Sequence, residues 1–182
     1  MVERAQLSPN QMATLARVKL VVFDVDGTLT DGRVLYDDRG ELQQFDVHDG
    51  QGLAWLHRAG LQLSWITGRG CPATQARARE LGVQELHMRS GPKAEVLRAV
   101  QERLGLTRGE TLAMGDDLPD LALAQESAFF AAPADARPEV RQRADWVSGS
   151  RAGHGAAREL SELLLRAKGL WNPLLDSYGI GI

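Results

Sequence analysis

Two aspartates, Asp24 and Asp26, stand two residues apart directly after an apolar run that spans residues 18–23. The run is rich in β-branched residues, which is typical of a strand buried on both faces of a parallel sheet. Carboxylates at alternate positions of an extended chain lie on the same side of the backbone, and Gly27 permits the sharp turn that follows. An acidic pair beside apolar residues is costly, so this spacing favours a metal site or catalysis.

Three later motifs supply groups that phosphoryl transfer requires. Thr67 offers a hydroxyl and Gly68 an unobstructed backbone N–H, while Lys93 can balance the charge of phosphoryl oxygens. Asp116 can ligate a metal ion, and we expect Asp117 to orient Lys93 or a metal-bound water rather than to ligate directly. Each motif alone is also common in turns, surface helices and caps. Their order along the chain makes the combination informative.

These groups together indicate a phosphatase site that holds Mg²⁺. We expect Asp24 to be the nucleophile, because carboxylates can form acyl-phosphate intermediates. Mg²⁺ prefers oxygen ligands, and Asp24 and Asp116 can provide them together with the backbone carbonyl of Asp26. The side chain of Asp26 then remains free to donate a proton to the leaving oxygen and to accept one from water. Asp120 is expected to support the Asp116 loop.

Apolar runs alternate with helical patterns from residue 18 to residue 168, which predicts an α/β fold with a mostly parallel sheet covered on both faces. The predicted strands span residues 18–23, 62–66, 83–88, 111–114, 128–131 and 145–147. The predicted helices span residues 11–17, 49–59, 72–81, 93–104, 118–125, 137–143 and 155–168. The motifs all follow strands, so we expect them to gather at one edge of the sheet.

Residues 33–47 predict a β-hairpin inserted after the first strand. Its strands are expected at residues 34–36 and 42–47, around turn residues 37–40. The next helix is expected to begin with Asp49 as its cap. A hairpin alone is marginally stable in water, so it must pack on its own domain or on another subunit.

Residues 1–182 are expected to form a single domain with its core at residues 18–168. The apolar tail, residues 169–182, either folds onto its own core or reaches a neighbouring subunit. Gly179 and Gly181 weaken any helix in this tail.

Composition narrows the class of protein. The 182 residues carry a net charge of −3, with 25% charged and 43% hydrophobic residues, and no charge block predicts nucleic-acid or membrane binding. Cys71 is alone, which favours a reducing compartment. No apolar run is long enough for a membrane span, and residues 1–17 lack the apolar centre of a signal peptide. We therefore expect a cytoplasmic protein.

The four motifs resemble those of the haloacid dehalogenase superfamily, whose members are mostly magnesium-dependent phosphatases. This resemblance implies a Rossmann-like three-layer domain. Members usually carry a cap domain over the substrate. Here the segments available for a cap, residues 33–47 and the stretch between Lys93 and Gly115, are too short. The chain therefore resembles the capless members.

The segments 23–32, 45–50, 66–69, 115–117 and 153–159 more closely resemble the family of 3-deoxy-D-manno-octulosonate 8-phosphate phosphatases. That resemblance implies a capless homotetramer that releases phosphate and the eight-carbon sugar acid used in lipopolysaccharide. It also implies a set of substrate contacts: Asp26, Asp46, Val47, His48, Asp49, Gly50, Gly68, Arg69, Arg77 and Lys93. Guanidinium groups suit a substrate that carries a carboxylate and a phosphate.

Three positions depart from this family's usual pattern, and alternatives stay open at this point. The family commonly has arginine, asparagine and arginine where this chain has His48, Asp46 and Ala54. A capless phosphatase for a nine-carbon sugar acid 9-phosphate is therefore one alternative. A phospho-accepting receiver domain is another, although Asp26 disfavours it because a base beside the nucleophile shortens the life of an acyl-phosphate. An inactive scaffold is the third.

Overall fold

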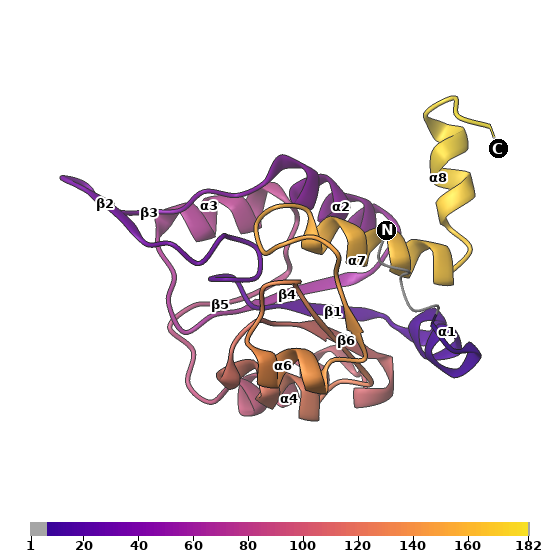
Figure 1. The fold of residues 1–182 in the computed structure, drawn as a ribbon, viewed down its shortest axis with the longest axis horizontal. Coiled ribbons are helices and arrows are strands. Elements are labelled where there is room, and N and C mark those ends of the chain that lie inside the picture. The colour runs from indigo at the N-terminus through magenta and orange to yellow at the C-terminus, as the bar shows by residue number, and fades with distance from the viewer. Residues whose placement is uncertain (1–6, 182) are drawn as a thin grey trace.

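The computed structural model describes residues 7–181 and is built around a six-stranded sheet in the order β5-β4-β1-β6-β7-β8. Every neighbouring pair in this sheet is parallel, and helices cover both faces (Figure 1). The strands are β1 Leu20–Phe23, β4 Gln62–Ile66, β5 Glu85–His87, β6 Thr111–Met114, β7 Phe129–Ala132 and β8 Trp146–Val147. The predicted α/β fold with a mostly parallel sheet is confirmed.

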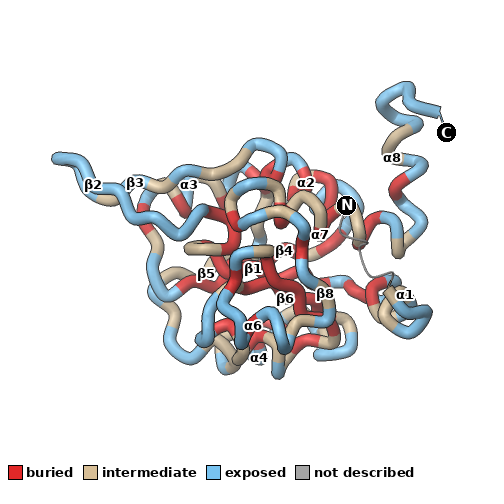
Figure 2. Tube along the Cα trace, viewed as in Figure 1, coloured by how far each residue is buried: buried red, intermediate tan, exposed pale blue. Residues whose placement is uncertain are grey.

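The two faces of the sheet bury separate apolar clusters. Along β1, Val21 and Phe23 point to one cluster and Leu20 and Val22 to the other, as alternation in a strand requires. The first cluster is covered by α1 Pro9–Arg17, α2 Val47–Arg58, α3 Pro72–Glu80 and α7 Ala156–Ala167. The second is covered by α4 Lys93–Leu104, α5 Leu121–Gln125 and α6 Pro138–Arg143. Figure 2 shows the buried strands between these layers.

The hairpin is shorter than predicted, because α2 begins earlier. Its strands are β2 Leu35–Asp37 and β3 Gly40–Leu42, so the expectation of a strand over residues 42–47 is wrong. The predicted Asp49 cap is also wrong. Asp46 is the N-cap, and its carboxylate accepts hydrogen bonds from the backbone N–H groups of His48 and Asp49, at 2.6 and 3.2 Å. These bonds satisfy donors that the first helical turn leaves unpaired.

The hairpin projects from the body of the protein (Figure 1) and is mostly exposed (Figure 2). Leu35 and Tyr36 are 51% and 70% exposed. Within residues 7–181, no second folded unit covers the carboxyl edge of the sheet. The protein accordingly has the capless architecture that the short insertions predict.

The described part of the tail contacts the body of its own chain at both ends. Trp171 is buried, and its ring meets the ring of Trp55 edge-on with centroids 5.9 Å apart. The hydroxyl of Tyr178 accepts a hydrogen bond from Trp55 Nε1 at 3.1 Å. Between these contacts, α8 (Trp171–Ser177) rises from the body (Figure 1), with Leu174 and Leu175 packed against the first apolar cluster. It ends two residues before Gly179, which has φ +75°. Of the tail, residue 182 lies outside the described residues.

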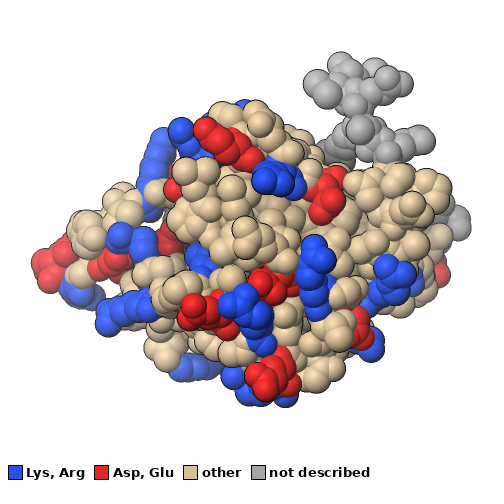
Figure 3. Space-filling model, turned by 90° about the horizontal axis from the view of Figure 1, so that it is seen from below, with Lys and Arg blue, Asp and Glu red and all other residues tan. Residues whose placement is uncertain are grey.

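Charged side chains of both signs are interspersed over the face shown in Figure 3. None of the helices in residues 7–181 combines the length and the apolar character needed to cross a membrane.

Candidate active site

The predicted site residues gather where the topology places them, at the carboxyl edge of the sheet. β1 lies between β4 and β6. Asp24 directly follows β1, Thr67 follows β4, and Asp116 stands two residues beyond the end of β6. Lys93 opens α4, after β5, and its Nζ lies 2.5 Å from Asp24 Oδ1. In open α/β sheets this crevice is where ligands bind.

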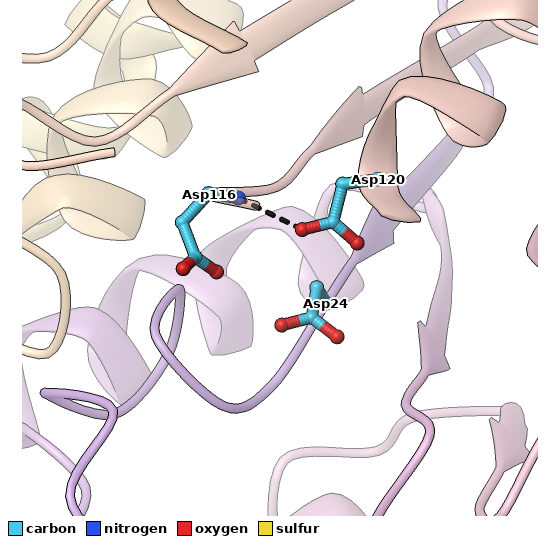
Figure 4. Close-up of side chains that lie close together, drawn as sticks. All are labelled: Asp24, Asp116 and Asp120. Carbon is cyan, nitrogen blue, oxygen red and sulfur yellow. Dashed lines mark hydrogen bonds between the residues drawn. The ribbon is translucent and has the colours of Figure 1, made fainter. Parts of the chain in front are cut away.

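Three carboxylates form the centre of this site (Figure 4). Asp24, Asp116 and Asp120 each offer an oxygen, and these oxygens all lie within 4.8 Å of one another. Asp24 and Asp120 are buried. Lys93 Nζ is 2.5 Å from an oxygen of Asp24 and 2.5 Å from an oxygen of Asp120. Three carboxylates against this one ammonium leave an excess of negative charge in a buried place, which is costly unless a cation or protons compensate.

The titration of these groups reflects that excess. Burial raises the pKa of Asp24 to about 8, and the neighbouring Asp120 carboxylate also raises it. Together these two effects outweigh Lys93, which lowers the pKa. Burial likewise raises the pKa of Asp116 to about 7, again reinforced by Asp120. For Lys93, burial lowers the pKa, but the charges of Asp24 and Asp120 outweigh it, and the net shift is upward. A divalent cation can replace the protons that the two carboxyl groups otherwise retain.

The donor set fits Mg²⁺, which prefers carboxylate and carbonyl oxygens. Both oxygens of Asp120 are already engaged. Oδ1 receives Lys93, and Oδ2 accepts the backbone N–H groups of Asp116 and Asp117 at 2.9 and 3.0 Å. Asp24 and Asp116 each keep an oxygen without a hydrogen bond among the described residues. They stay the proposed side-chain ligands, with the backbone carbonyl of Asp26 as the third.

The turn after β1 holds Asp116 in place. The hydroxyl of Thr28 donates a hydrogen bond to Asp116 Oδ1 at 2.9 Å. Gly27 has φ +91°, and a Cβ there would lie 2.3 Å from Asp116 Oδ2. A side chain at this position would therefore displace the carboxylate, which explains why the motif has glycine here.

In the metal-free protein, the free energy of unfolding is expected to fall as pH rises from about 5 to about 7. Folded Asp24 and Asp116 keep their protons in this window, whereas the unfolded groups, with pKa values near 3.8, have lost them. The folded state then binds more protons than the unfolded state, so stability decreases with pH by about 1.4 kcal/mol per pH unit for each proton.

Urea unfolding at several pH values, with EDTA or with saturating MgCl₂, measures this slope. Mg²⁺ is expected to flatten it, because the metal takes the place of the protons. A metal-free protein whose stability rises over the same window would contradict the assignment of the cluster as an under-neutralised metal site.

The side chain of Asp26 is held by Thr67 and Gln43. Its Oδ2 accepts a hydrogen bond from the Thr67 hydroxyl at 2.8 Å, and its Oδ1 accepts one from Gln43 Nε2 at 2.8 Å. Thr67 Oγ1 in turn accepts the backbone N–H of Arg69 at 3.1 Å. Gly68 faces open space, since a Cβ there would meet nothing within 4 Å. The site thus leaves room beside Gly68 for a phosphoryl group.

Asp120, and not Asp117, contacts Lys93. The Asp117 side chain is exposed and accepts a hydrogen bond from the backbone N–H of Leu118 at 2.8 Å. The 3₁₀ turn Leu118–Asp120 carries Asp120 back to the strand end, where it is 2% exposed. The expectation that Asp117 orients Lys93 is therefore wrong, whereas a role of Asp117 toward a metal-bound water stays a prediction. The spacing of the two aspartates, which is that of a capping box, is the sequence signal that points to Asp120.

Asp49 is turned into the body of the protein. The resemblance implies a substrate contact here, but the carboxylate is 3% exposed and accepts the backbone N–H groups of Gly155 and Arg158 at 3.2 and 2.7 Å. Burial raises its pKa, against the lowering effect of these bonds. Asp49 therefore anchors the start of α7 on α2.

The remaining residues of the predicted substrate loop divide into exposed and packed ones. Val47 is 71% exposed, and the His48 side chain, 75% exposed, has its Nδ1 3.5 Å from Asp46. Gly50 packs on Arg77, because a Cβ there would lie 1.9 Å from Arg77 Nη2. Arg77 Nη2 also donates to the Asp46 carbonyl at 3.3 Å, so this guanidinium lies beneath the loop.

Arg69 is held by the hairpin of its own chain. Its Nη2 donates hydrogen bonds to Glu41 Oε2 at 2.8 Å and to the Tyr36 hydroxyl at 3.3 Å. These bonds raise the pKa of Arg69, the hydroxyl of Tyr36 contributing most and the Glu41 carboxylate next. A substrate carboxylate bound by Arg69 would have to compete with Glu41.

Comparison with known proteins also indicates a phosphatase of the haloacid dehalogenase type. Residues 83–160 match the model of haloacid dehalogenase-like hydrolases. The 3-deoxy-D-manno-octulosonate 8-phosphate phosphatase of Salmonella typhimurium is 33% identical over 164 residues, which are 90% of this chain and 87% of that protein. The protein of the same name from Haemophilus influenzae is 35% identical and covers 85% of this chain and 87% of its own length.

The solved structures extend the likeness to three dimensions. The crystal structure of 3-deoxy-D-manno-octulosonate 8-phosphate phosphatase from Moraxella catarrhalis, in complex with a magnesium ion, a phosphate ion and a KDO molecule, has a TM-score of 0.90 at 32% identity. The match covers 94% of this chain and 99% of that chain. The resemblance predicted from the motifs is confirmed. This chain belongs to the 3-deoxy-D-manno-octulosonate 8-phosphate phosphatase family of haloacid dehalogenase-like hydrolases.

Proposed function

We propose that this protein is a Mg²⁺-dependent phosphatase that hydrolyses 3-deoxy-D-manno-octulosonate 8-phosphate to the free sugar acid and phosphate. The buried cluster of Asp24, Asp116 and Asp120 around Lys93 is the observation that carries the proposal. The relatives of this chain are named for this activity, which supports the identity of the substrate. The product is the sugar acid used in lipopolysaccharide precursor synthesis.

In the first step, a carboxylate oxygen of Asp24 attacks the phosphorus, and the bond from phosphorus to the sugar oxygen breaks. Asp26 gives its proton to the departing sugar oxygen, which leaves as an alcohol. Lys93 stays beside Asp24 and balances the negative charge of the transferring group. The Thr67 hydroxyl and the Gly68 N–H hold phosphoryl oxygens in the open space beside Gly68.

In the second step, Asp26 takes a proton from water as the water oxygen attacks the phosphorus of the acyl-phosphate. The bond between phosphorus and the Asp24 oxygen breaks, which restores the carboxylate and releases inorganic phosphate. Asp24, Asp116 and the Asp26 carbonyl would hold Mg²⁺, which supplies charge neutralisation for the phosphoryl group. Asp120 orients Lys93 and the Asp116 loop through the bonds described above.

Recognition of the sugar acid is assigned to cationic and polar groups around this centre. Arg69 is the proposed partner of the substrate carboxylate, and it would exchange Glu41 for the substrate. The His48 side chain is exposed in the first turn of α2 and can donate a hydrogen bond to the substrate. Arg77 supports the loop from beneath through its bond to the Asp46 carbonyl.

We also propose a homotetramer in the cytoplasm. The exposed apolar side chains of the projecting hairpin, Leu35, Tyr36 and Leu42, support association through this element. A neighbouring subunit would also provide the wall that the capless site lacks. The lone Cys71, free and buried, suits a reducing compartment. A monomeric mass in sedimentation would contradict the tetramer.

A panel of sugar-acid phosphates tests the substrate. With Mg²⁺, the eight-carbon 8-phosphate is expected to give the highest kcat/KM by at least about tenfold, and EDTA is expected to abolish turnover. Equal or better hydrolysis of the nine-carbon 9-phosphate would replace the proposed substrate by that ester. An aspartyl-phosphate at Asp24 that lasts for minutes would instead favour the receiver function.

A further inference from the structure

Gln43 connects the hairpin to the proton-transferring aspartate. It lies in the segment between β3 and α2, and its Nε2 donates a hydrogen bond to Asp26 Oδ1 at 2.8 Å. Its other end, Oε1, accepts hydrogen bonds from the Thr74 hydroxyl and, at 3.4 Å, from the Cys71 thiol. Both groups belong to the start of α3.

The orientation of the Gln43 amide is fixed by these partners. The Thr74 hydroxyl accepts the backbone N–H of Cys71 at 3.1 Å, so its own proton is available for Gln43 Oε1. The carbonyl end therefore faces donors, and the NH₂ end must face the carboxylate of Asp26. Thr74 and Cys71 are 0% and 7% exposed, so water does not compete at this end.

The backbone of the segment is fixed as well. Phe45, two residues after Gln43, stacks on Trp65 with ring centroids 5.9 Å apart and an angle of 20° between the planes. Trp65 is 0% exposed. The Gln43 side chain is thus held at both ends. Its backbone is fixed through Phe45, and its carbonyl oxygen is fixed by the buried Thr74 hydroxyl. Gln44 is exposed and makes no side-chain hydrogen bond in the described part of the chain.

We propose that Gln43 is a positioning residue that holds Asp26 ready for both proton transfers, an inference that rests on the proposed phosphatase function. The Thr67 hydroxyl has a single hydrogen to donate. Once it donates a hydrogen bond to a phosphoryl oxygen, it can no longer donate one to Asp26. The amide of Gln43 then remains as the donor to Asp26. This amide donates to Oδ1, whereas Oδ2 is the oxygen that faces Thr67.

The test compares Gln43→Ala and Gln43→Glu with Gln44→Ala as the matched control. For the sugar phosphate, kcat of Gln43→Ala is expected to fall roughly ten- to hundredfold with KM little changed, since the hydrogen bond that orients Asp26 is lost. Gln43→Glu keeps the shape and the acceptor for Thr74 but turns an oxygen to Asp26, so its loss should be at least as large. Gln44→Ala is expected to match the wild type.

p-Nitrophenyl phosphate separates positioning from a general structural effect. Its aryl oxide leaves without a proton, so the first step does not need Asp26, whereas hydrolysis of the acyl-phosphate does. Gln43→Ala is therefore expected to show a full burst of p-nitrophenol followed by a steady rate reduced roughly ten- to hundredfold. A burst amplitude that falls together with the thermal midpoint would assign Gln43 a structural role and overturn the proposal.

The outcomes also distinguish this inference from the proposed function. A wild-type protein inactive toward every sugar phosphate and toward p-nitrophenyl phosphate would overturn the phosphatase function itself. An active wild type with Gln43→Ala equal to it on both substrates would overturn only the role of Gln43.

Discussion

Replacing Asp24 by asparagine is expected to abolish turnover, with a loss of at least about 10⁴-fold in kcat. The amide that takes its place lacks the carboxylate oxygen that must bond to phosphorus. The change keeps the size of a side chain that is 7% exposed, so packing is preserved. Steady-state phosphate release and the absence of a covalent phospho-enzyme in acid-quenched samples provide the measurement.

The stability of this variant separates chemistry from folding. Because burial raises the pKa of Asp24 to about 8, its ionised form is disfavoured in the metal-free fold. Asp24→Asn is therefore expected to be at least as stable as the wild type at pH 8 in EDTA. Asp38→Asn makes the same chemical change on an exposed hairpin residue and serves as the control. Turnover retained by Asp24→Asn would reject Asp24 as the nucleophile.

The core of the fold could be predicted from the sequence because each strand is a short apolar run with a clear stop. β4 and β6 have the predicted bounds, and α4 spans Lys93–Leu104 as predicted and is followed by Gly105, whose φ of +64° suits a helix terminus. In these segments the apolar pattern, the terminating residues and the observed burial all favour the same strand or helix.

The predicted start of α2 was wrong because a contact distant in sequence decides it. Asp46 and Asp49 are both good N-caps, and the sequence alone does not say which of them finds free N–H donors. The structure places Asp46 there, because Asp49 is used 106 residues away by the backbone of Gly155. A contact across such a separation leaves no trace in the local pattern.

The candidate site also has some residues that the local sequence predicts and others that it does not. Its members at strand ends are predictable, since parallel strands present their carboxyl ends at one edge. The second carboxylate partner of Lys93, Asp120, was not predicted, because the direction of the turn after Asp116 decides whether Asp117 or Asp120 reaches the ammonium. Gln43 was missed altogether. Its role depends on the path by which the hairpin returns to the sheet.

Asp26→Asn is expected to lower kcat by about 10²- to 10⁴-fold while leaving Mg²⁺ binding intact. The asparagine cannot donate the proton that the sugar oxygen needs, nor take one from water, so both chemical steps slow. Its backbone carbonyl, the proposed metal ligand, is unchanged. The neighbours can adapt, because the Thr67 hydroxyl, which donates to Asp26 at 2.8 Å, can rotate to accept from the new amide.

Two measurements together decide the role of Asp26. Titration calorimetry is expected to give the wild-type affinity for Mg²⁺, and rapid quench is expected to show slow formation and slow decay of the Asp24 phospho-enzyme with the sugar phosphate. With p-nitrophenyl phosphate, formation should recover, since its leaving group needs no proton, while decay stays slow. A normal turnover rate would mean that another group moves the proton, and a lost Mg²⁺ affinity would mean that the carboxylate rather than the carbonyl of Asp26 binds the metal.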